Sequence, residues 1–397
     1  MVDRRDFLRL GAGAALGLAG VDGLAQDAAP GIRRYVQLGR TGLRVSDISF
    51  GSASSSDPEL VTHALARGIN YFDTAESYHW GGAEEAIGMA LKGKRDQVVL
   101  STKTKAGASD TRADMMKALE GSLRRLQTDR VDIYFNHAVN DVNRMQNREW
   151  WEFTELAKRQ GKIRFRGMSG HGSNLVACLD YAVDHDLVDV ILAAHSFGRD
   201  PSFIDRMRHT FHWAAIQPEL PTMLEKAKSK DIGVVAMKTL MGGRLNDMRP
   251  YERAGGTFAQ AAFRWVLSGP HVDALVVSMT STQLIDEYVA ASGGGKVAAA
   301  DFELLARYAQ MHGGTYCLPG CNACRESCPV DVPIAEVLRT RMYDVDYGDV
   351  RLARDEYAEL APAASACLTC SHRACLHACP AGIPIAELTR DAARRLA

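Results

Sequence analysis

The chain has 397 residues, which is more than one ordinary domain, so a large domain with an appendage is expected. Hydrophobic residues make up 46% of the sequence, and the formal net charge of -1 indicates neither nucleic acid nor an anionic membrane as a partner. Eight of the nine cysteines follow Tyr316, which leaves Cys178 alone in the earlier part of the chain. Cys178 lies in an apolar helical pattern and is expected to be a small buried hydrophobic residue.

Residues 1–25 have the features of a targeting segment. The run DRRDFLR at positions 3–9 is similar to the twin-arginine signal of bacterial export. A weakly apolar run rich in glycine and alanine follows over Leu10–Val21, and the small residues GLA at positions 23–25 suit a cleavage site. The glycines disfavour a stable amphipathic helix, and the run is too short for a transmembrane anchor. We therefore expect export to the periplasm without a membrane span.

Strand and helix patterns alternate after a small hairpin expected over residues 34–45. The expected strands are Ser46–Phe50, Ile69–Asp73, Val98–Lys103, Val131–His137, Ile163–Ser169, Asp189–Ala193, Gly233–Lys238 and Ala274–Ser278. The helices between them include Pro58–Arg67, Arg112–Leu126, Asn174–His185 and Thr257–Leu267. Eight such repeats predict an α/β fold, a closed (β/α)8 TIM barrel. An open doubly wound sheet is disfavoured because no G-x-G-x-x-G follows the first strand.

Titratable side chains stand at three of these strand ends. Asp73 ends the second strand, and Tyr78 follows on the loop. Lys103 ends the third strand and His137 ends the fourth. A lone aspartate at such a place is most often a helix cap or a turn residue. Because polar groups at successive strand ends are the layout of a barrel active site, the four residues together favour a shared site.

Three motifs at these strand ends resemble the aldo-keto reductase family: NYFDTAESY at 70–78, VLSTK at 99–103 and VDIYFNH at 131–137. The resemblance extends over residues 34–291 and implies an oxidoreductase, NAD(P)-dependent, that interconverts a small carbonyl compound and an alcohol. It makes Tyr78 the general acid/base, with Asp73 and Lys103 tuning it and His137 orienting the carbonyl or alcohol. A free tyrosine titrates at about 10, and a neighbouring ammonium group is expected to lower that pKa.

The later strand ends are expected to hold the nicotinamide cofactor. By the resemblance, Ser169 stands in the family's usual Ser-Asn position, and the segment from Lys238 resembles the pyrophosphate loop. In that loop, backbone N–H groups near Gly242 and Gly243 can approach phosphate closely, and Arg244 adds positive charge. An ordinary loop between strand and helix is the alternative.

Three departures from the family pattern bear on this cofactor. Leu192 stands where the family usually has a glutamine that holds the carboxamide, and Gly170 replaces the usual asparagine. No lysine or arginine lies between His271 and Lys296, the segment from which the family grips the adenosine 2′-phosphate. A 2′-phosphate without a basic partner loses its charge-assisted contacts, so NAD is expected rather than NADP.

The end of the chain carries two runs of cysteine. The glycine-rich stretch Ser292–Lys296 is expected to be a flexible boundary, and Ala298–His312 a helix leading into the cysteine region. The first run is Cys317, Cys321, Cys324 and Cys328, and the second is Cys367, Cys370, Cys375 and Cys379; each ends in Cys-Pro. Helices are expected between the runs at Ile334–Arg341 and Ala353–Leu360.

Each run resembles the bacterial ferredoxin motif, with one internal spacing lengthened, and the module resembles the helical ferredoxins of respiratory subunits. The resemblance implies two 4Fe–4S clusters with crossed ligation, in which the last cysteine of each run serves the other cluster. Zinc bound by four thiolates and disulfide bonds are the alternatives. Zinc is less typical of a doubled run with Cys-Pro, and disulfides between such close cysteines would make strained rings.

The expected organisation is a signal at 1–25, a barrel at 34–292 and a helical iron–sulfur domain at 300–397. The expected function is an exported aldo-keto reductase-like enzyme coupled to electron transfer through its clusters, with a small substrate and a redox partner protein. A hydride carries two electrons together whereas each cluster passes one, and the sequence supplies no mediator between them. An electron-transfer or interaction subunit with an idle barrel is the alternative.

Overall fold

The computed structural model describes residues 30–199, 202–203, 217–241, 248–253, 256–312, 317, 321–346 and 348–397. Within this part of the chain, eight parallel strands close into a barrel in the order β10-β3-β4-β5-β6-β7-β8-β9. Their bounds are β3 Ile48–Gly51, β4 Tyr71–Asp73, β5 Val99–Thr104, β6 Val131–Asn136, β7 Ile163–Gly170, β8 Val190–Ala194, β9 Gly233–Met237 and β10 Ala274–Ser278. The predicted TIM barrel is confirmed, and each predicted strand overlaps an observed one. The twin-arginine run and the predicted cleavage site lie outside the described residues.

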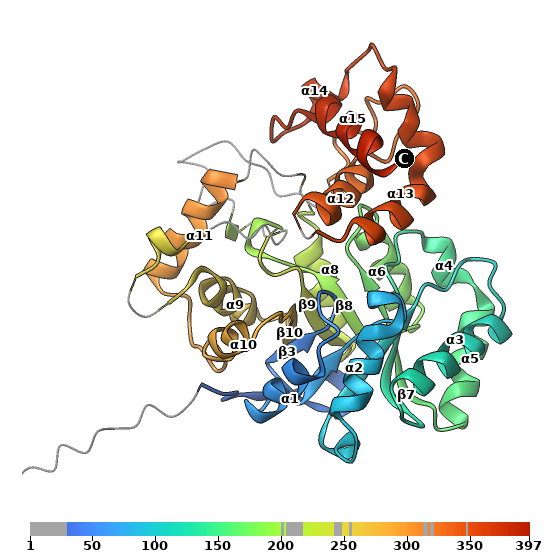
Figure 1. The fold of residues 1–397 in the computed structure, drawn as a ribbon, viewed down its shortest axis with the longest axis vertical. Helices are drawn as coiled ribbons and strands as arrows, with labels where there is room; N and C mark the ends of the chain where they lie inside the picture. Colours follow the sequence, from blue (N-terminus) through green and yellow to red (C-terminus); the bar gives the residue numbers. More distant parts are fainter. Residues whose placement is uncertain are drawn as a thin grey trace, which may run out of the picture.

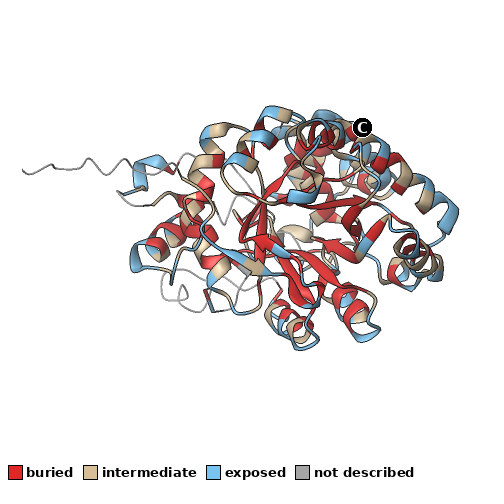
Figure 2. Cartoon of the chain, turned by 90° about the horizontal axis from the view of Figure 1, so that it is seen from below, coloured by how far each residue is buried: buried red, intermediate tan, exposed pale blue. Residues whose placement is uncertain are grey.

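Helices surround the barrel and bury one face each against it (Figure 1). They are α1 Pro58–Ala66, α2 Gly82–Ala90, α3 Arg112–Arg125, α4 Val142–Gln146, α5 Arg148–Arg159, α6 Leu175–Asp184, α8 Leu220–Ser229, α9 Phe258–Ser268 and α10 Thr282–Val289. Capping boxes begin two of the predicted helices, with Thr111 before α3 and Thr257 before α9. Figure 2 shows buried residues concentrated on the strands and on the inner faces of these helices.

The interior of the barrel is apolar at the end where the strands begin. An antiparallel hairpin of β1 Tyr35–Gln37 and β2 Arg44–Ser46 lies at that end. Its residues Leu38, Leu43 and Val45 pack with Tyr71, Val99, Ile133, Val190, Val235 and Ala274, which stand at or near the first positions of their strands. The tight approach needs a glycine, because a Cβ on Gly39 would lie 2.4 Å from the backbone nitrogen of Gly233. The polar residues are left at the opposite end, which we call the barrel mouth.

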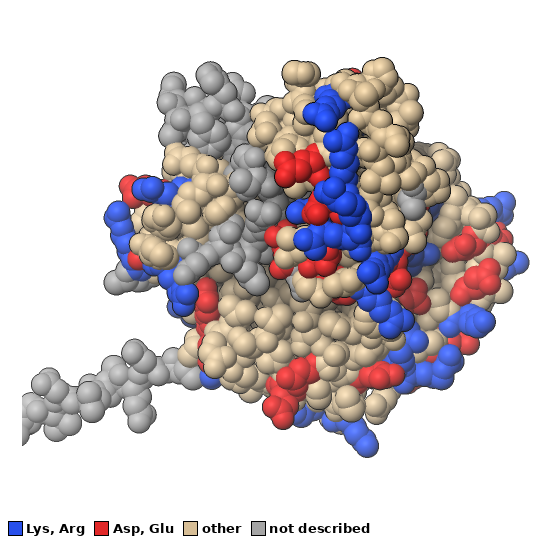
Figure 3. Space-filling model, turned by 45° about the horizontal axis from the view of Figure 1, so that its top comes forward, with Lys and Arg blue, Asp and Glu red and all other residues tan. Residues whose placement is uncertain are grey.

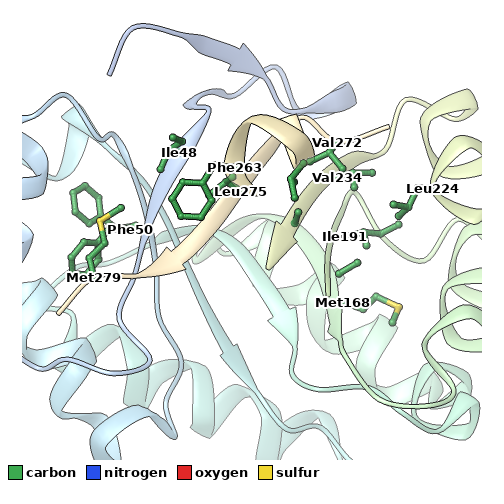
Figure 4. Close-up of a cluster of buried hydrophobic side chains, with 14 of the residues drawn as sticks. Ile48, Phe50, Met168, Ile191, Leu224, Val234, Phe263, Val272, Leu275 and Met279 are labelled. Atoms are coloured by element: carbon green, nitrogen blue, oxygen red, sulfur yellow. The ribbon is translucent and has the colours of Figure 1, made fainter. Parts of the chain in front are cut away.

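The outward faces of the strands form the main core. Figure 4 shows Ile48 and Phe50 of β3 with Leu275 of β10 and Phe263 of α9 in this layer. Such strands are apolar on both faces because helices cover one face and the barrel interior the other. That pattern explains why the strand positions could be predicted closely.

The predicted flexible link at Ser292–Lys296 is wrong at its first residues. Ser292 is fully buried, and its hydroxyl donates to Asp47 Oδ1 at 2.6 Å. The next helix, α11 Ala299–His312, packs on α9 and contributes Leu304, Leu305 and Tyr308 to the barrel's core. The packing of the barrel therefore extends through α11, beyond the division predicted between residues 292 and 300.

The last part of the chain is a helical unit with its own apolar core. Its helices are α12 Ile334–Val345, α13 Val350–Ala364, α14 Cys375–Ala378 and α15 Ile385–Leu396. We call Cys317 and residues 321–397 the C-terminal module. In Figure 1 its helices form a separate group, with α12 and α13 nearest to the barrel. Both α12 and α13 are longer than predicted, because their apolar positions continue in contact with α15. None of the described helices is long and apolar enough to cross a bilayer.

Candidate functional site

Asp73 and Lys103 form a buried ion pair at the barrel mouth. Parallel pairing sets Asp73 of β4 opposite Ser101 of β5, so Lys103, two residues further on, reaches the same side. The Lys103 Nζ atom lies 2.6 Å from Asp73 Oδ2 and donates to the carbonyl oxygen of Thr74 at 2.5 Å. The Lys103 side chain is 1% exposed and the Asp73 side chain is 5% exposed. Burial lowers the pKa of Lys103, and Asp73 opposes that shift.

Ser101 holds the other oxygen of the aspartate. Its hydroxyl donates to Asp73 Oδ1 at 2.6 Å. Ser101 lies inside the VLSTK motif, but a serine within an apolar strand does not by itself predict a hydrogen bond to Asp73. With one oxygen bonded to Ser101 and the other to Lys103, Asp73 is fixed in orientation.

Tyr78 lies on a turn of 3-10 helix, Tyr78–Gly81, directly after the β4 loop. Its ring meets the ring of His137 edge-on, with centroids 5.6 Å apart. The Lys103 Nζ atom lies 4.8 Å from the centroid of the tyrosine ring. The structure thus brings all four predicted residues, Asp73, Tyr78, Lys103 and His137, to one place.

The loops that carry these groups hold unusual backbone conformations. His79 and Trp80 follow the tyrosine with φ of 48° and 54°, and Ala138 follows His137 with φ of 51°. Left-handed conformations in residues other than glycine are costly, and they cluster at functional sites when the surroundings enforce them. The strained turn after β4 fixes where the tyrosine stands.

The expected lowering of the Tyr78 pKa does not occur. Burial raises the pKa of Tyr78 above its ordinary value, and the carboxylate of Asp73 raises it further. The physical reason is that Asp73 compensates the positive charge of Lys103, and the ammonium lies over the ring instead of bonding the phenol oxygen. Tyr78 is therefore a neutral phenol at physiological pH, a form that donates a proton.

His137 is held as a neutral imidazole. Its backbone N–H donates to the carbonyl oxygen of Thr104 at 2.8 Å. Burial and the charge of Lys103 keep the pKa of His137 well below its ordinary value. Within the described part of the chain, its buried Nδ1 atom has no hydrogen-bond partner. A neutral imidazole beside the tyrosine can bond a substrate oxygen without supplying the proton.

Arg144 of α4 braces the loop after β6, and sequence reasoning missed it. Its guanidinium donates to the carbonyl oxygens of Ala106, His137 and Ala138 at 2.7, 2.8 and 3.0 Å. Only the fold brings these carbonyl groups around one arginine, so no sequence pattern marks it. The contacts fix the backbone on both sides of His137.

Of the five predicted cofactor residues, the structure describes Ser169 and Lys238. Ser169 is the next-to-last residue of β7, where its hydroxyl accepts a hydrogen bond from the Ala138 N–H at 3.0 Å. Lys238 follows β9 in a left-handed conformation, with φ of 56°. Gly242, Gly243 and Arg244 lie outside the described residues.

The departures from the family pattern have structural consequences. A Cβ atom on Gly170 would lie 2.6 Å from Leu175 Cδ1, so an asparagine does not fit there without movement. Leu192 is 1% exposed and packs in the barrel interior, where it offers no hydrogen bond. In the segment that lacks basic residues, Asp286 accepts bonds from Arg67 Nε at 2.6 Å and Nη2 at 2.9 Å. Arg67, directly after α1, therefore supplies positive charge near this segment and is already paired.

The eight module cysteines gather in two groups. One pocket is lined by Cys328, Cys367, Cys370 and Cys375. The other group is Cys317 with its neighbours Cys321, Cys324 and Cys379. Burial and these neighbouring thiols raise the pKa of Cys317. The last cysteine of each run thus lies with the first three of the other. Backbone N–H groups of Val332 and Ile383 donate to the sulfurs of Cys328 and Cys379, each at 3.4 Å.

The described cysteines are free thiols, including Cys178, which is buried in the barrel as predicted. Among the described residues, no three His, Cys, Asp or Glu side chains lie close enough to bind one metal ion.

Known proteins resemble the barrel part of the chain. The profile of the Aldo/keto reductase family matches residues 48–253. The uncharacterized oxidoreductase YrpG of Bacillus subtilis is 32% identical over 254 residues, which are 57% of this chain and 73% of that protein. L-galactose dehydrogenase of Arabidopsis thaliana is 27% identical over 293 residues, which are 64% of this chain and 86% of that protein.

A solved structure agrees with these matches. An aldo-keto reductase from Klebsiella pneumoniae in complex with NADPH superposes with a TM-score of 0.54 and 26% identity, over 71% of this chain and 95% of that one. The family profile covers more than half of the 397 residues and includes Asp73, Tyr78, Lys103 and His137. The chain therefore belongs to the aldo/keto reductase family.

Proposed function

We propose that the barrel mouth interconverts a carbonyl compound and an alcohol, with Tyr78 as the group that gives or takes the proton. The observation that carries the proposal is the meeting of Tyr78, His137, Lys103 and Asp73 at one mouth. L-galactose dehydrogenase, a relative, carries an alcohol oxidation in its name. That name supports the reaction class here and leaves the substrate open.

In the reduction direction, each group has a distinct part. His137, neutral and with a ring nitrogen that has no hydrogen-bond partner among the described residues, bonds the carbonyl oxygen and orients it. Tyr78 donates its phenolic proton to that oxygen as the alcohol forms. Lys103 stabilises the phenolate that remains, and Asp73 holds the ammonium in place. A bound nicotinamide would supply the hydride.

A nicotinamide dinucleotide fits the mouth in part. Ser169 and Lys238 stand at strand ends where the family resemblance places cofactor contacts. Leu192 and Gly170 remove two polar contacts that the family usually provides. The relative from Klebsiella pneumoniae holds NADPH, which argues for NADP, whereas the missing basic residues argue for NAD. We therefore propose NAD(P) without choosing between the two forms.

Release of bound nucleotide tests this part of the proposal. Because no free pool would replace a cofactor lost outside the cytoplasm, a dinucleotide should be held with a slow dissociation rate. Protein purified from the periplasm is denatured, and the supernatant is assayed for NAD and NADP by enzymatic cycling. An empty barrel that also fails to bind added NAD(H) or NADP(H) would refute the hydride mechanism.

For the module, we propose two 4Fe–4S clusters with crossed ligation. A single metal ion holds its thiolates about 2.3 Å from its centre, whereas a cubane spreads four thiolates over four iron atoms. In each group, three cysteines of one run lie with the last cysteine of the other run, which is the set that crossed cubane ligation requires. The backbone N–H groups that reach Cys328 and Cys379 would stabilise thiolate charge there.

Iron analysis and one pair of variants test the clusters. Cubanes predict about eight iron and eight sulfide per chain. Cys328→Ala should damage the cluster held by the second run and leave most of the other signal in electron paramagnetic resonance, and Cys379→Ala should do the reverse. Zinc without acid-labile sulfide would refute the clusters, and the opposite assignment of signals would refute the crossed ligation.

We also propose export through the twin-arginine route, which carries folded proteins and therefore suits one whose clusters are assembled in the cytosol. The support is the sequence of residues 3–9 alone. The double variant Arg4→Lys/Arg5→Lys should keep the protein, with its clusters, in the cytoplasm. Unchanged export in cell fractionation would contradict the route.

A second candidate function is an electron-transfer subunit whose barrel is idle. Two departures from the family pattern favour this candidate, the apolar Leu192 in place of the glutamine that holds the carboxamide and the crowded Gly170. The complete Asp73, Tyr78, Lys103 and His137 constellation favours the enzyme, since an idle site needs no buried ion pair. The nucleotide assay separates the two, because an idle barrel predicts no bound or added dinucleotide.

A further inference from the structure

Helix α13 of the C-terminal module contacts the barrel mouth beside the tyrosine. Lys105 follows β5, and its Nζ atom lies 3.1 Å from Glu356 Oε1 of α13. The Arg351 guanidinium of α13 lies over the ring of Trp80 at 3.9 Å from its centroid. Trp80 belongs to the same strained turn as Tyr78. Helix α13 therefore covers the loops after β4 and β5, and Figure 3 shows acidic and basic side chains close together on the face that carries the module.

Helix α12 crosses the rest of the mouth. Near its first turn, Glu336 Oε1 accepts hydrogen bonds from Asn140 Nδ2 at 3.3 Å and from Ser173 Oγ at 3.2 Å. These two residues lie on the loops after β6 and β7. Near its last turn, the ring of Tyr343 lies 5.8 Å from the Nζ atom of Lys238, which follows β9. Together α12 and α13 contact five strand-end loops.

The barrel-facing side of α12 is polar where simple packing would be apolar. Glu336, Arg339 and Tyr343 are spaced by three and four residues, so they share one helix face. The neighbouring Val337 and Leu338 face the module's own core. A helix that only docked on the barrel would need no charged groups in this buried stripe.

Two atoms of this stripe lack hydrogen-bond partners among the described residues. Glu336 is 7% exposed, and its Oε2 atom is buried without a partner. The Nε atom of Arg339 is likewise buried and unbonded, while its Nη2 atom lies 3.8 Å from Glu356 Oε2. A buried polar atom left unbonded is unfavourable, so a ligand that bonds both atoms would recover the free energy lost there.

We propose that α12 completes the active site, and that Arg339 and Glu336 bind hydroxyl groups of a neutral, hydroxyl-rich carbonyl compound or the matching alcohol. The proposal rests on the proposed function of the barrel. A hydroxyl group can accept a hydrogen bond from the arginine and donate one to the glutamate. An anionic substrate would meet the charges of Glu336 and Glu356, and a cationic one would meet Arg339 and Lys238. A neutral polyol avoids both conflicts.

A matched pair of aldehydes tests the role of the two residues. Glyceraldehyde and propanal have the same carbon chain and differ only in two hydroxyl groups. The full-length, cluster-loaded protein should show a higher kcat/KM for glyceraldehyde. Arg339→Gln and Glu336→Gln should each lower kcat/KM for glyceraldehyde by about 10- to 100-fold more than kcat/KM for propanal, which is the effect of losing a hydrogen bond to a charged group. Arg354→Gln, an exposed residue on α13, serves as the control and should behave as the wild type.

Binding without turnover separates this proposal from the proposed function. Calorimetric titration should show glycerol binding more tightly than 1-propanol to the wild type, with that difference lost in both variants. If neither aldehyde is reduced, the proposed function fails while the titration still tests the helix. Equal losses for both aldehydes would assign the residues to domain docking, and an unchanged preference would overturn the proposal outright. Unchanged iron content and circular dichroism establish that each variant is folded, and Arg339→Lys provides a second, more conservative variant.

Discussion

Removal of one oxygen atom, in Tyr78→Phe, should abolish most of the activity and leave the fold intact. The phenylalanine ring would keep the edge-on contact with His137 at 5.6 Å and the position under Lys103 at 4.8 Å. The substrate oxygen would keep its bond to His137, so KM should change little. A positioned general acid contributes about 10²- to 10⁴-fold in rate, and at 1.36 kcal/mol per factor of ten this is about 2.7–5.4 kcal/mol of transition-state stabilisation.

The assay is the oxidation of NADPH or NADH, followed by absorbance with saturating aldehyde. Tyr35→Phe is the matched control, because Tyr35 lies on the hairpin at the opposite end of the barrel and its hydroxyl donates to the carbonyl oxygen of Gly68. The control should retain full kcat. A kcat for Tyr78→Phe within about threefold of the wild type would refute the role of the phenol in proton transfer.

Two further predictions concern the stability of the barrel. The pKa of His137 is lower in the folded protein than in the unfolded chain. As the pH falls below about 6.5, the unfolded chain therefore binds the proton first. The free energy of unfolding then decreases by up to about 1.4 kcal/mol per pH unit. His137→Gln should therefore show a smaller loss of the urea midpoint between pH 7.5 and 5.5, and an identical loss would contradict the buried neutral imidazole. Gly170→Ala should destabilise the barrel by about 1–3 kcal/mol, because the new Cβ would lie 2.6 Å from Leu175 Cδ1. Gly295→Ala, which meets no atom within 4 Å, is the control, and equal unfolding midpoints would show that Leu175 yields without strain.

The barrel and its four central residues could be predicted from sequence because the signals are local. The buried parallel strands that carry or precede the central residues are short runs that end at a polar residue, as Tyr71–Asp73 does, so these strand ends and the site residues can be predicted together. The parallel barrel then carries all the strand ends to one side. This is why Asp73, Tyr78, Lys103 and His137 meet although the sequence shows no contact between them.

Errors arose where a property depends on contacts between distant segments. The pKa of Tyr78 rises because the phenol is buried and because the nearby carboxylate of Asp73 opposes a negative charge on it, and motifs reveal neither effect. Ser292, just before a run of glycines, is buried where it bonds Asp47, 245 residues earlier in the chain. Glu336 meets Asn140 across 196 residues, so the cover over the barrel mouth carries no sequence pattern.

Transfer of deuterium tests the central claim most directly. The full-length protein is freed of bound nucleotide, loaded with NADPH or NADH labelled at C4 with deuterium, on one face and then on the other, and given an aldehyde; the product is analysed by mass spectrometry. The account predicts one deuterium per product molecule, on the carbinol carbon, from one of the two faces, and no such product from Tyr78→Phe. An alcohol product without deuterium from either face would show that the electrons do not arrive as a hydride at this site, and would contradict the account.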